Sequence, residues 1–150
     1  MHNDEHYMHL ALDEARKAAG MNEVPVGAVV IDADGIIIGR GHNLTEEQQS
    51  PLAHAELLAI QQATKSISSK WLVDCTMYVT LEPCPMCAGA ISSARIKRLV
   101  YGAFDVKGGA VASVMNIYDY SFNHKPMVKS RVLADECGKL LSDFFRGLRD

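Results

Sequence analysis

Two cysteines and one histidine constrain the fold of this chain more than any other feature, because they must meet in space to act together. Cys84 and Cys87 lie three residues apart, a spacing that places two side chains on one face of a helix. Pro83 and Pro85 fit the start of that helix, where a proline loses no needed N–H. His54 falls in the first turn of a second predicted helix, so we expect the two helix starts to share one cavity.

The three side chains have the chemistry of a zinc site. An imidazole nitrogen and two thiolates suit Zn²⁺, and the positive end of a helix favours the thiolate form of cysteine. The pair could instead be a redox dithiol or half of a structural zinc site, but a structural site needs four protein ligands and the chain has no second Cys-x-x-Cys. Three ligands leave one tetrahedral position open, so the sequence predicts a catalytic Zn²⁺ bound by His54, Cys84 and Cys87.

Glu56 lies two residues beyond His54 and is the candidate catalytic acid and base. Zinc lowers the pKa of a bound water from roughly 15.7 to about 7, and a nearby carboxylate can pass the water's proton to a leaving amine. The alternative is a carboxylate that only interacts with the helix dipole. Because Glu56 occurs together with the cysteine pair, the catalytic interpretation is favoured, and the sequence predicts a zinc hydrolase.

The remaining cysteines and histidines lack metal-ligand spacing. Cys75 and Cys137 are predicted to be small buried apolar residues. No metal-binding role is expected for the other five histidines, which are His2, His6, His9, His42 and His124.

Composition indicates one globular domain over residues 1–150, with 48% hydrophobic and 22% charged residues. No apolar run predicts a membrane span, and the start of the chain lacks the pattern of a secretory signal. We therefore expect a cytoplasmic protein. The net charge of −3 is uneven, because residues 95–150 carry ten Lys or Arg against six Asp or Glu. This basic third could follow a phosphate backbone, although composition alone favours a solvated surface on which these charges cluster incidentally.

Hydrophobic periodicity predicts a helix and a hairpin, followed by alternating helices and strands. Helices are expected over residues 4–19, from about 53 to 65, from the cysteine pair through Ser93, and after a cap at Asp135. Strands are expected over residues 24–31, 36–41, 75–80, 98–101 and 129–133, and loops over 44–52 and 104–112. This order indicates an α/β fold with helices on both faces of a mixed sheet.

The paired motif and its flanks resemble the bacterial tRNA-specific adenosine deaminases of the cytidine-deaminase-like superfamily. His-x-Glu followed by Pro-Cys-x-x-Cys is the signature of zinc nucleobase deaminases. Residues 105–109 and the helix with Phe144 and Phe145 are most similar to the tRNA enzymes. Similar segments extend over nearly the whole chain, at residues 23–29, 42–43, 53–56, 78–84, 86–90, 122–124 and 143–146.

The resemblance implies a three-layer α/β/α sandwich with a five-stranded mixed sheet, and a homodimer whose second subunit helps to complete the RNA site. It implies deamination of adenosine to inosine at the wobble position (34) of tRNA, typically arginine tRNA. By position, His54, Cys84 and Cys87 would bind Zn²⁺ and Glu56 would move the proton. Residues that would contact the anticodon loop are Asn43, on the flipped nucleotide, and Val26, Leu81, Asp105, Lys107, Asn123 and Phe145.

Simpler explanations exist for some of these residues. An asparagine after a strand more often caps a turn than reads a ligand, Lys107 could be a solvated loop residue, and aromatics such as Phe144 more often belong to a core. Two departures from the family pattern also lie nearby. Leu52 stands where a threonine is usual, which removes one possible helix cap, and Ala112 stands where a glycine usually precedes Ser113.

Two other functions fit parts of the pattern. A small-molecule deaminase of the same superfamily would act on guanine or cytosine. Free-cytidine enzymes commonly have cysteine where His54 stands, however, and the Phe-Phe helix argues against the guanine branch. A non-catalytic RNA-binding or metal-storage module would not require Glu56.

Overall fold

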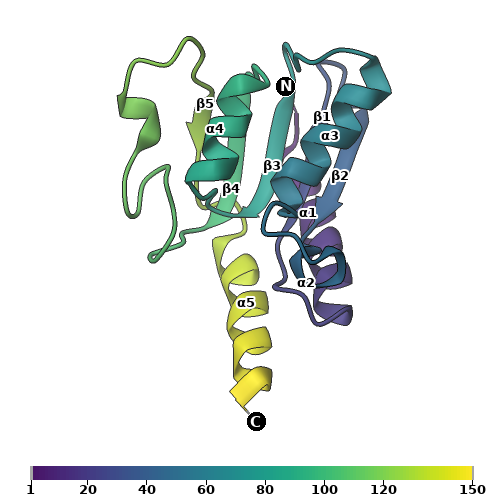
Figure 1. Ribbon diagram of the computed structural model, residues 1–150, viewed down its shortest axis with the longest axis vertical. Coiled ribbons are helices and arrows are strands. Elements are labelled where there is room, and N and C mark those ends of the chain that lie inside the picture. The colour runs from purple at the N-terminus through teal and green to yellow at the C-terminus, as the bar shows by residue number, and fades with distance from the viewer. Residues whose placement is uncertain (1, 150) are drawn as a thin grey trace.

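A computed structural model describes residues 2–149 and contains a five-stranded mixed sheet between two layers of helices (Figure 1). The strand order is β2-β1-β3-β4-β5; β1 is antiparallel to β2 and β3, whereas β4 is parallel to β3 and β5. The strands are β1 (Gly27–Ile31), β2 (Ile37–His42), β3 (Thr76–Leu81), β4 (Arg98–Ala103) and β5 (Met127–Lys129). The helices are α1 (Asp4–Gly20), α2 (Thr45–Gln48), α3 (Ala55–Ile67), α4 (Pro85–Ser93), the 3-10 helix η1 (Ile117–Asp119) and α5 (Ala134–Arg149). The predicted three-layer α/β architecture is confirmed.

Two apolar cores, one on each face of the sheet, hold the layers together. On the face covered by α3 and α4, Ala59 and Ile91 pack with Met77 of β3. On the face covered by α1 and α5, Leu12 packs with Tyr78 of β3. Every residue of β1 is buried, as expected for a strand covered on both faces.

Glycines in β2 allow α3 to approach the sheet closely. A Cβ atom on Gly39 would overlap the carbonyl oxygen of Ala59, and one on Gly41 would overlap the carbonyl oxygen of Ala55. A strand glycine is often a site where another backbone comes near. Because α3 lies directly on β2, the first turn of α3 is held at a fixed place beside the end of the sheet.

The start of α1 is joined to the sheet by Asp4. Its carboxylate accepts two hydrogen bonds from Arg98, at 2.6 and 2.7 Å, and further hydrogen bonds from Tyr78 at 2.8 Å and Lys129 at 3.0 Å. The Arg98 guanidinium holds the pKa of Asp4 well below its usual range, even though burial opposes this shift. These contacts connect α1 with β3, β4 and β5 at the end where the parallel strands begin.

The prediction that the last strand covers residues 129–133 is wrong about its position. The observed β5 is Met127–Lys129, which pairs with Arg98–Val100. Arg131 and Leu133 have positive φ angles of 68° and 54°, so the chain turns there instead of extending. Val132 is nevertheless buried, because the turn inserts it into the core next to α1 and α5.

The prediction of an uninterrupted loop over residues 44–52 is also wrong, since α2 lies within it. The buried carboxylate of Glu23 accepts the backbone N–H groups of Glu46 and Glu47 at 3.1 and 2.8 Å, together with the hydroxyl of Thr45. A helix start needs partners for its free N–H groups. Here the partner is a side chain more than twenty residues away, which local sequence does not reveal.

The prediction of a single domain over residues 1–150 stays a prediction, and its two end residues, 1 and 150, lie outside the described part of the chain. Within residues 2–149, no helix combines the length and the apolar character that a membrane crossing requires.

Replacing Gly39 with alanine should lower the free energy of unfolding by about 1–3 kcal/mol, because the new methyl group overlaps the backbone of α3. Gly138→Ala is the matched control: apart from adjacent residues and the backbone of its own helix, no heavy atom lies within 4 Å of its Cβ position, and alanine in a helix should be neutral or stabilising by up to about 1 kcal/mol. Urea unfolding of both variants measures the difference. Equal stability of the two variants would show that α3 can shift away from β2.

Candidate metal centre and active site

The starts of α3 and α4 lie at the same end of the sheet, on either side of the lower end of β3 in Figure 1. His54 is the N-cap residue of α3, and Cys84 is the N-cap residue of α4 with Pro85 following it. Both cap residues have extended backbone conformations, which point their side chains beyond the helix ends. The local geometry expected from the prolines is therefore observed.

His54, Cys84 and Cys87 converge on one point. The Nδ1 atom of His54 lies 3.7 Å from the Sγ atom of Cys84 and 3.6 Å from that of Cys87, and the three ligand atoms lie within 4.8 Å of one another. Zn–S distances of about 2.3 Å and Zn–N distances of about 2.0–2.1 Å at tetrahedral angles separate two ligand atoms by roughly 3.5–3.8 Å. The observed spacing fits three ligands of a tetrahedrally coordinated metal ion, so this cluster could hold one.

Contacts within the cluster favour the thiolate form of Cys84 and the protonated forms of Cys87 and His54, as the shifts in their pKa values indicate. Hydrogen bonds from Cys87 and His54 lower the pKa of Cys84 to about 4. The contact with Cys84, together with burial, raises the pKa of Cys87, because the two sulfur atoms share one proton. The contact with Cys84 also raises the pKa of His54. A divalent cation at this position would replace the shared protons and stabilise both thiolates.

Glu56 lies in the first turn of α3 and is 4% exposed. Burial raises the pKa of its carboxyl group to about 7; the nearby His54 opposes this shift, and the negative charge of Cys84 adds to it. A carboxyl group whose pKa lies near neutral pH can both accept and release a proton during a reaction. Its position beside Cys87 and His54 suits that role.

Asn43 supplies the helix cap that Leu52 does not. Its Oδ1 atom accepts the backbone N–H of Ala55 at 2.9 Å, which satisfies one free donor at the start of α3. Its backbone N–H donates to the carbonyl of Val26 at 3.2 Å, so these two predicted site residues are neighbours. The Nδ2 group remains to donate to a ligand, and the capping and binding interpretations of Asn43 are compatible.

Three further predicted residues follow β3 and β4 toward the same end of the sheet. Leu81 is the last residue of β3 and pairs with Ala103. Asp105 and Lys107 lie in the loop after β4, and the backbone N–H of Asp105 donates to the carboxylate of Glu82 at 3.1 Å. Glu82 is a residue that sequence reasoning did not assign. A charged residue directly before the Pro-Cys pair was the available signal.

Asn123 and Phe145 are not brought to the cluster within one chain. Asn123 is exposed and precedes His124, whose Nε2 atom contacts the Ile96 carbonyl at 2.6 Å and whose own carbonyl accepts the Ser92 hydroxyl. Asn123 therefore lies near the C-terminal end of α4, whereas Cys84 lies at its N-terminal end, and this nine-residue helix is about 13 Å long. Phe145 is 44% exposed on α5, which extends away from the sheet (Figure 1). Their RNA contacts stay predictions.

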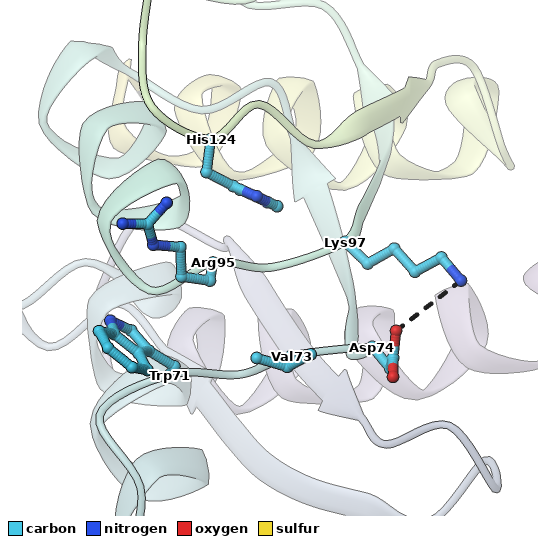
Figure 2. Close-up of a pocket in the computed structure, with 6 residues that line it drawn as sticks. All are labelled: Trp71, Val73, Asp74, Arg95, Lys97 and His124. Carbon is cyan, nitrogen blue, oxygen red and sulfur yellow. Dashed lines mark ion pairs between the residues drawn. The ribbon is translucent and has the colours of Figure 1, made fainter.

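Figure 2 shows a cavity of about 440 Å³ that is separate from the cluster. It lies where β3 and β4 begin, whereas the metal cluster lies beyond the end of β3. Its lining residues are Trp71, Val73, Asp74, Arg95, Lys97 and His124.

Several known proteins with similar sequences are named tRNA-specific adenosine deaminase. A family model described as MafB19-like deaminase matches residues 2–149. The tRNA-specific adenosine deaminase of Bacillus subtilis (strain 168) is 51% identical over 150 residues, which cover 99% of this chain and 92% of that protein.

The structural comparisons agree. A solved structure from a study of A-to-I editing by tRNA:A34 deaminases at the wobble position of transfer RNA has a TM-score of 0.88 at 46% identity, covering 91% of this chain and 99% of that one. A guanine deaminase from Bacillus subtilis is less similar, with a TM-score of 0.64 at 32% identity over 81% of this chain and 88% of that one. Because the match to the first group extends over nearly the whole chain at about half identity, the protein belongs to the MafB19-like deaminase family, among the tRNA-specific adenosine deaminases.

Proposed function

We propose that the protein is a zinc-dependent deaminase that converts adenosine to inosine at the wobble position (34) of tRNA, typically arginine tRNA. The observation that carries the proposal is the cluster of His54, Cys84 and Cys87 with the buried Glu56 beside it. This arrangement provides metal ligands and a proton carrier in a chain 51% identical to a tRNA-specific adenosine deaminase. Zinc is proposed because one nitrogen and two sulfur ligands suit it best.

The reaction replaces the amino group on C6 of adenine with oxygen from water and releases ammonia. Zinc bound by the cluster would supply the Lewis acidity that makes water a nucleophile near neutral pH. Ionised Glu56 would take a proton from the attacking water, and protonated Glu56 would give it to the amino nitrogen as the C6–N bond breaks. Because the pKa of Glu56 is raised to about 7, both forms are accessible at neutral pH.

We propose substrate contacts for five residues at this end of the sheet. Asn43 is held against the start of α3, so its Nδ2 group would donate to the flipped nucleotide. The carbonyl of Val26 accepts a hydrogen bond from the backbone N–H of Asn43, and Leu81 precedes Cys84 by three residues. Asp105 and Lys107 would contact the anticodon loop from the loop after β4.

We also propose that the protein acts as a homodimer in the cytoplasm. Asn123 and Phe145 lie away from the cluster of their own chain, which supports a role at RNA bound to the partner subunit. Their exposure leaves them available for such contacts.

Purified protein incubated with an arginine tRNA transcript that carries A34 should produce inosine at that position and release one ammonia per inosine. A transcript with G34 is the matched control and should be unchanged. Free guanine and cytosine should not be converted, which reverse-phase chromatography of the products would show. Conversion of a free base without conversion of the tRNA would instead support the small-molecule alternative.

Glu56→Gln should reduce kcat for tRNA deamination by a factor of about 10²–10⁴, because the amide cannot move the proton. Metal content, measured by atomic emission, should stay at the wild-type value. Glu5→Gln, an exposed glutamate in the first turn of α1, is the control and should retain full activity. A fully active Glu56→Gln enzyme would remove Glu56 from the mechanism.

Removal of the metal with a chelator should abolish deamination, and Zn²⁺ should restore it where Mg²⁺ does not, because thiolate ligands favour zinc. Cys87→Ala should lose the metal, whereas Cys75→Ala should keep it, although both cysteines are buried. Metal analysis and activity are measured on the same samples. Turnover by metal-free protein would contradict this assignment.

A further inference from the structure

The side chain of Glu82 is 2% exposed, and its carboxylate accepts five hydrogen bonds from residues 105–113, which we call the 105–113 loop. Its Oε1 atom accepts the backbone N–H of Asp105 at 3.1 Å and the hydroxyl of Ser113 at 2.5 Å. Its Oε2 atom accepts the backbone N–H groups of Val111, Ala112 and Ser113 at 3.1, 2.8 and 2.9 Å. Since a carboxylate has about four lone-pair sites, this loop saturates it.

Backbone N–H groups, rather than a cation, compensate the charge of Glu82. Among the side chains that the structure describes, no Lys, Arg or His nitrogen forms an ion pair with this carboxylate. A buried carboxylate is stable only when such partners surround it. The carboxylate and the loop conformation are therefore interdependent, because each satisfies the buried polar groups of the other.

The Pro83–Cys84 segment, which directly follows Glu82, connects the 105–113 loop to the metal cluster. The backbone N–H of Ala110 donates to the carbonyl of Pro83 at 2.9 Å, and Cys84 follows directly. A Cβ atom on Gly109 would overlap the Glu82 carboxylate, so glycine is needed where the loop crosses it. Ala112, the departure from the usual glycine, does not have a positive φ angle and fits without strain.

The loop presents a lysine at its outer turn. The Oδ1 atom of Asp105 accepts the backbone N–H groups of Lys107 and Gly108 at 3.2 and 3.1 Å, and the carbonyl of Asp105 accepts the N–H of Gly109 at 2.8 Å. Lys107 is exposed at this turn. Its side chain is therefore held on a structured turn close to the segment that carries Cys84.

We propose that Glu82 is a positioning residue for RNA binding, which fixes the 105–113 loop against the Pro83–Cys84 segment so that Lys107 meets the anticodon loop beside the metal cluster. This inference rests on the proposed function, because it assigns the loop to the tRNA substrate. Glu82 itself touches no substrate. It acts through the five hydrogen bonds that give the loop one conformation.

Glu82→Gln tests the proposal, because the amide keeps the size of the side chain but replaces one acceptor oxygen with an NH2 donor that would face the N–H and O–H donors of the loop. Hydrogen exchange at the amides of residues 105 and 111–113 should become at least about tenfold faster, since a buried donor without a partner is strongly unfavourable. The KM for the tRNA should rise by about tenfold or more, whereas metal content should stay at the wild-type value and kcat at saturating tRNA should change by less than about threefold. A merely structural role would not produce this separation of KM from kcat.

Two further variants keep the test decisive. Ser113→Ala removes one donor and leaves the carboxylate in place, so it should shift loop exchange and KM in the same direction by a smaller factor, even if Glu82→Gln fails to fold. Asp4→Asn disturbs another carboxylate network at the opposite end of the sheet and should leave both quantities unchanged.

The outcomes separate the two proposals. Three results for Glu82→Gln would each overturn the positioning role. They are wild-type hydrogen-exchange rates in the loop, an unchanged KM although the loop exchanges faster, and loss of the metal. Failure of the wild-type protein to deaminate any tRNA would refute the proposed function, and the exchange comparison would still decide whether Glu82 holds the loop.

Discussion

The structure depends on the meeting of two helix starts at one end of a mixed sheet. α4 follows β3 directly, and α3 is pressed onto β2 by two strand glycines, so the positions of both helices are set by the sheet itself. Only this arrangement brings the His54 imidazole within 3.7 Å of both cysteine sulfur atoms. The three candidate ligands are therefore positioned by the packing of α3 and α4 on the sheet, and not by the flexible loops that usually carry functional residues.

The buried side chains of Glu23, Glu56 and Glu82 differ in their electrostatics because their hydrogen-bond partners differ. Glu23 and Glu82 are surrounded by backbone N–H groups and organise the segments that supply these groups. Burial acts to raise the pKa of Glu82, but the hydrogen bonds from Ser113 and its neighbours outweigh it and the pKa is lowered. Glu56 is equally buried with fewer such donors, and its pKa rises to about 7. The same type of side chain therefore has a lowered pKa in one place and a raised pKa in another.

Most of the fold and the central site could be predicted because their signals are local. The stripe of α1, the apolar run of β1 and the prolines around Cys84 each indicate one element within a few residues. The features that could not be predicted depend on contacts between distant segments. α2 exists because Glu23 caps it, β5 ends early because Arg131 and Leu133 turn the chain, and the order of the 105–113 loop comes from Glu82. Asn43 shows an intermediate case, since its position after a strand indicated a capping residue but not which helix it caps.

The carboxylate of Asp4 has a further consequence for how the chain matures. Its partners Tyr78, Arg98 and Lys129 follow it by 74, 94 and 125 residues. During synthesis α1 leaves the ribosome before these partners do, and its anchoring point is complete only after Lys129 has been made. A nascent chain that stops before Lys129 retains one cationic partner fewer for this carboxylate. The contact thus couples the ordering of α1 to the synthesis of the chain as far as Lys129.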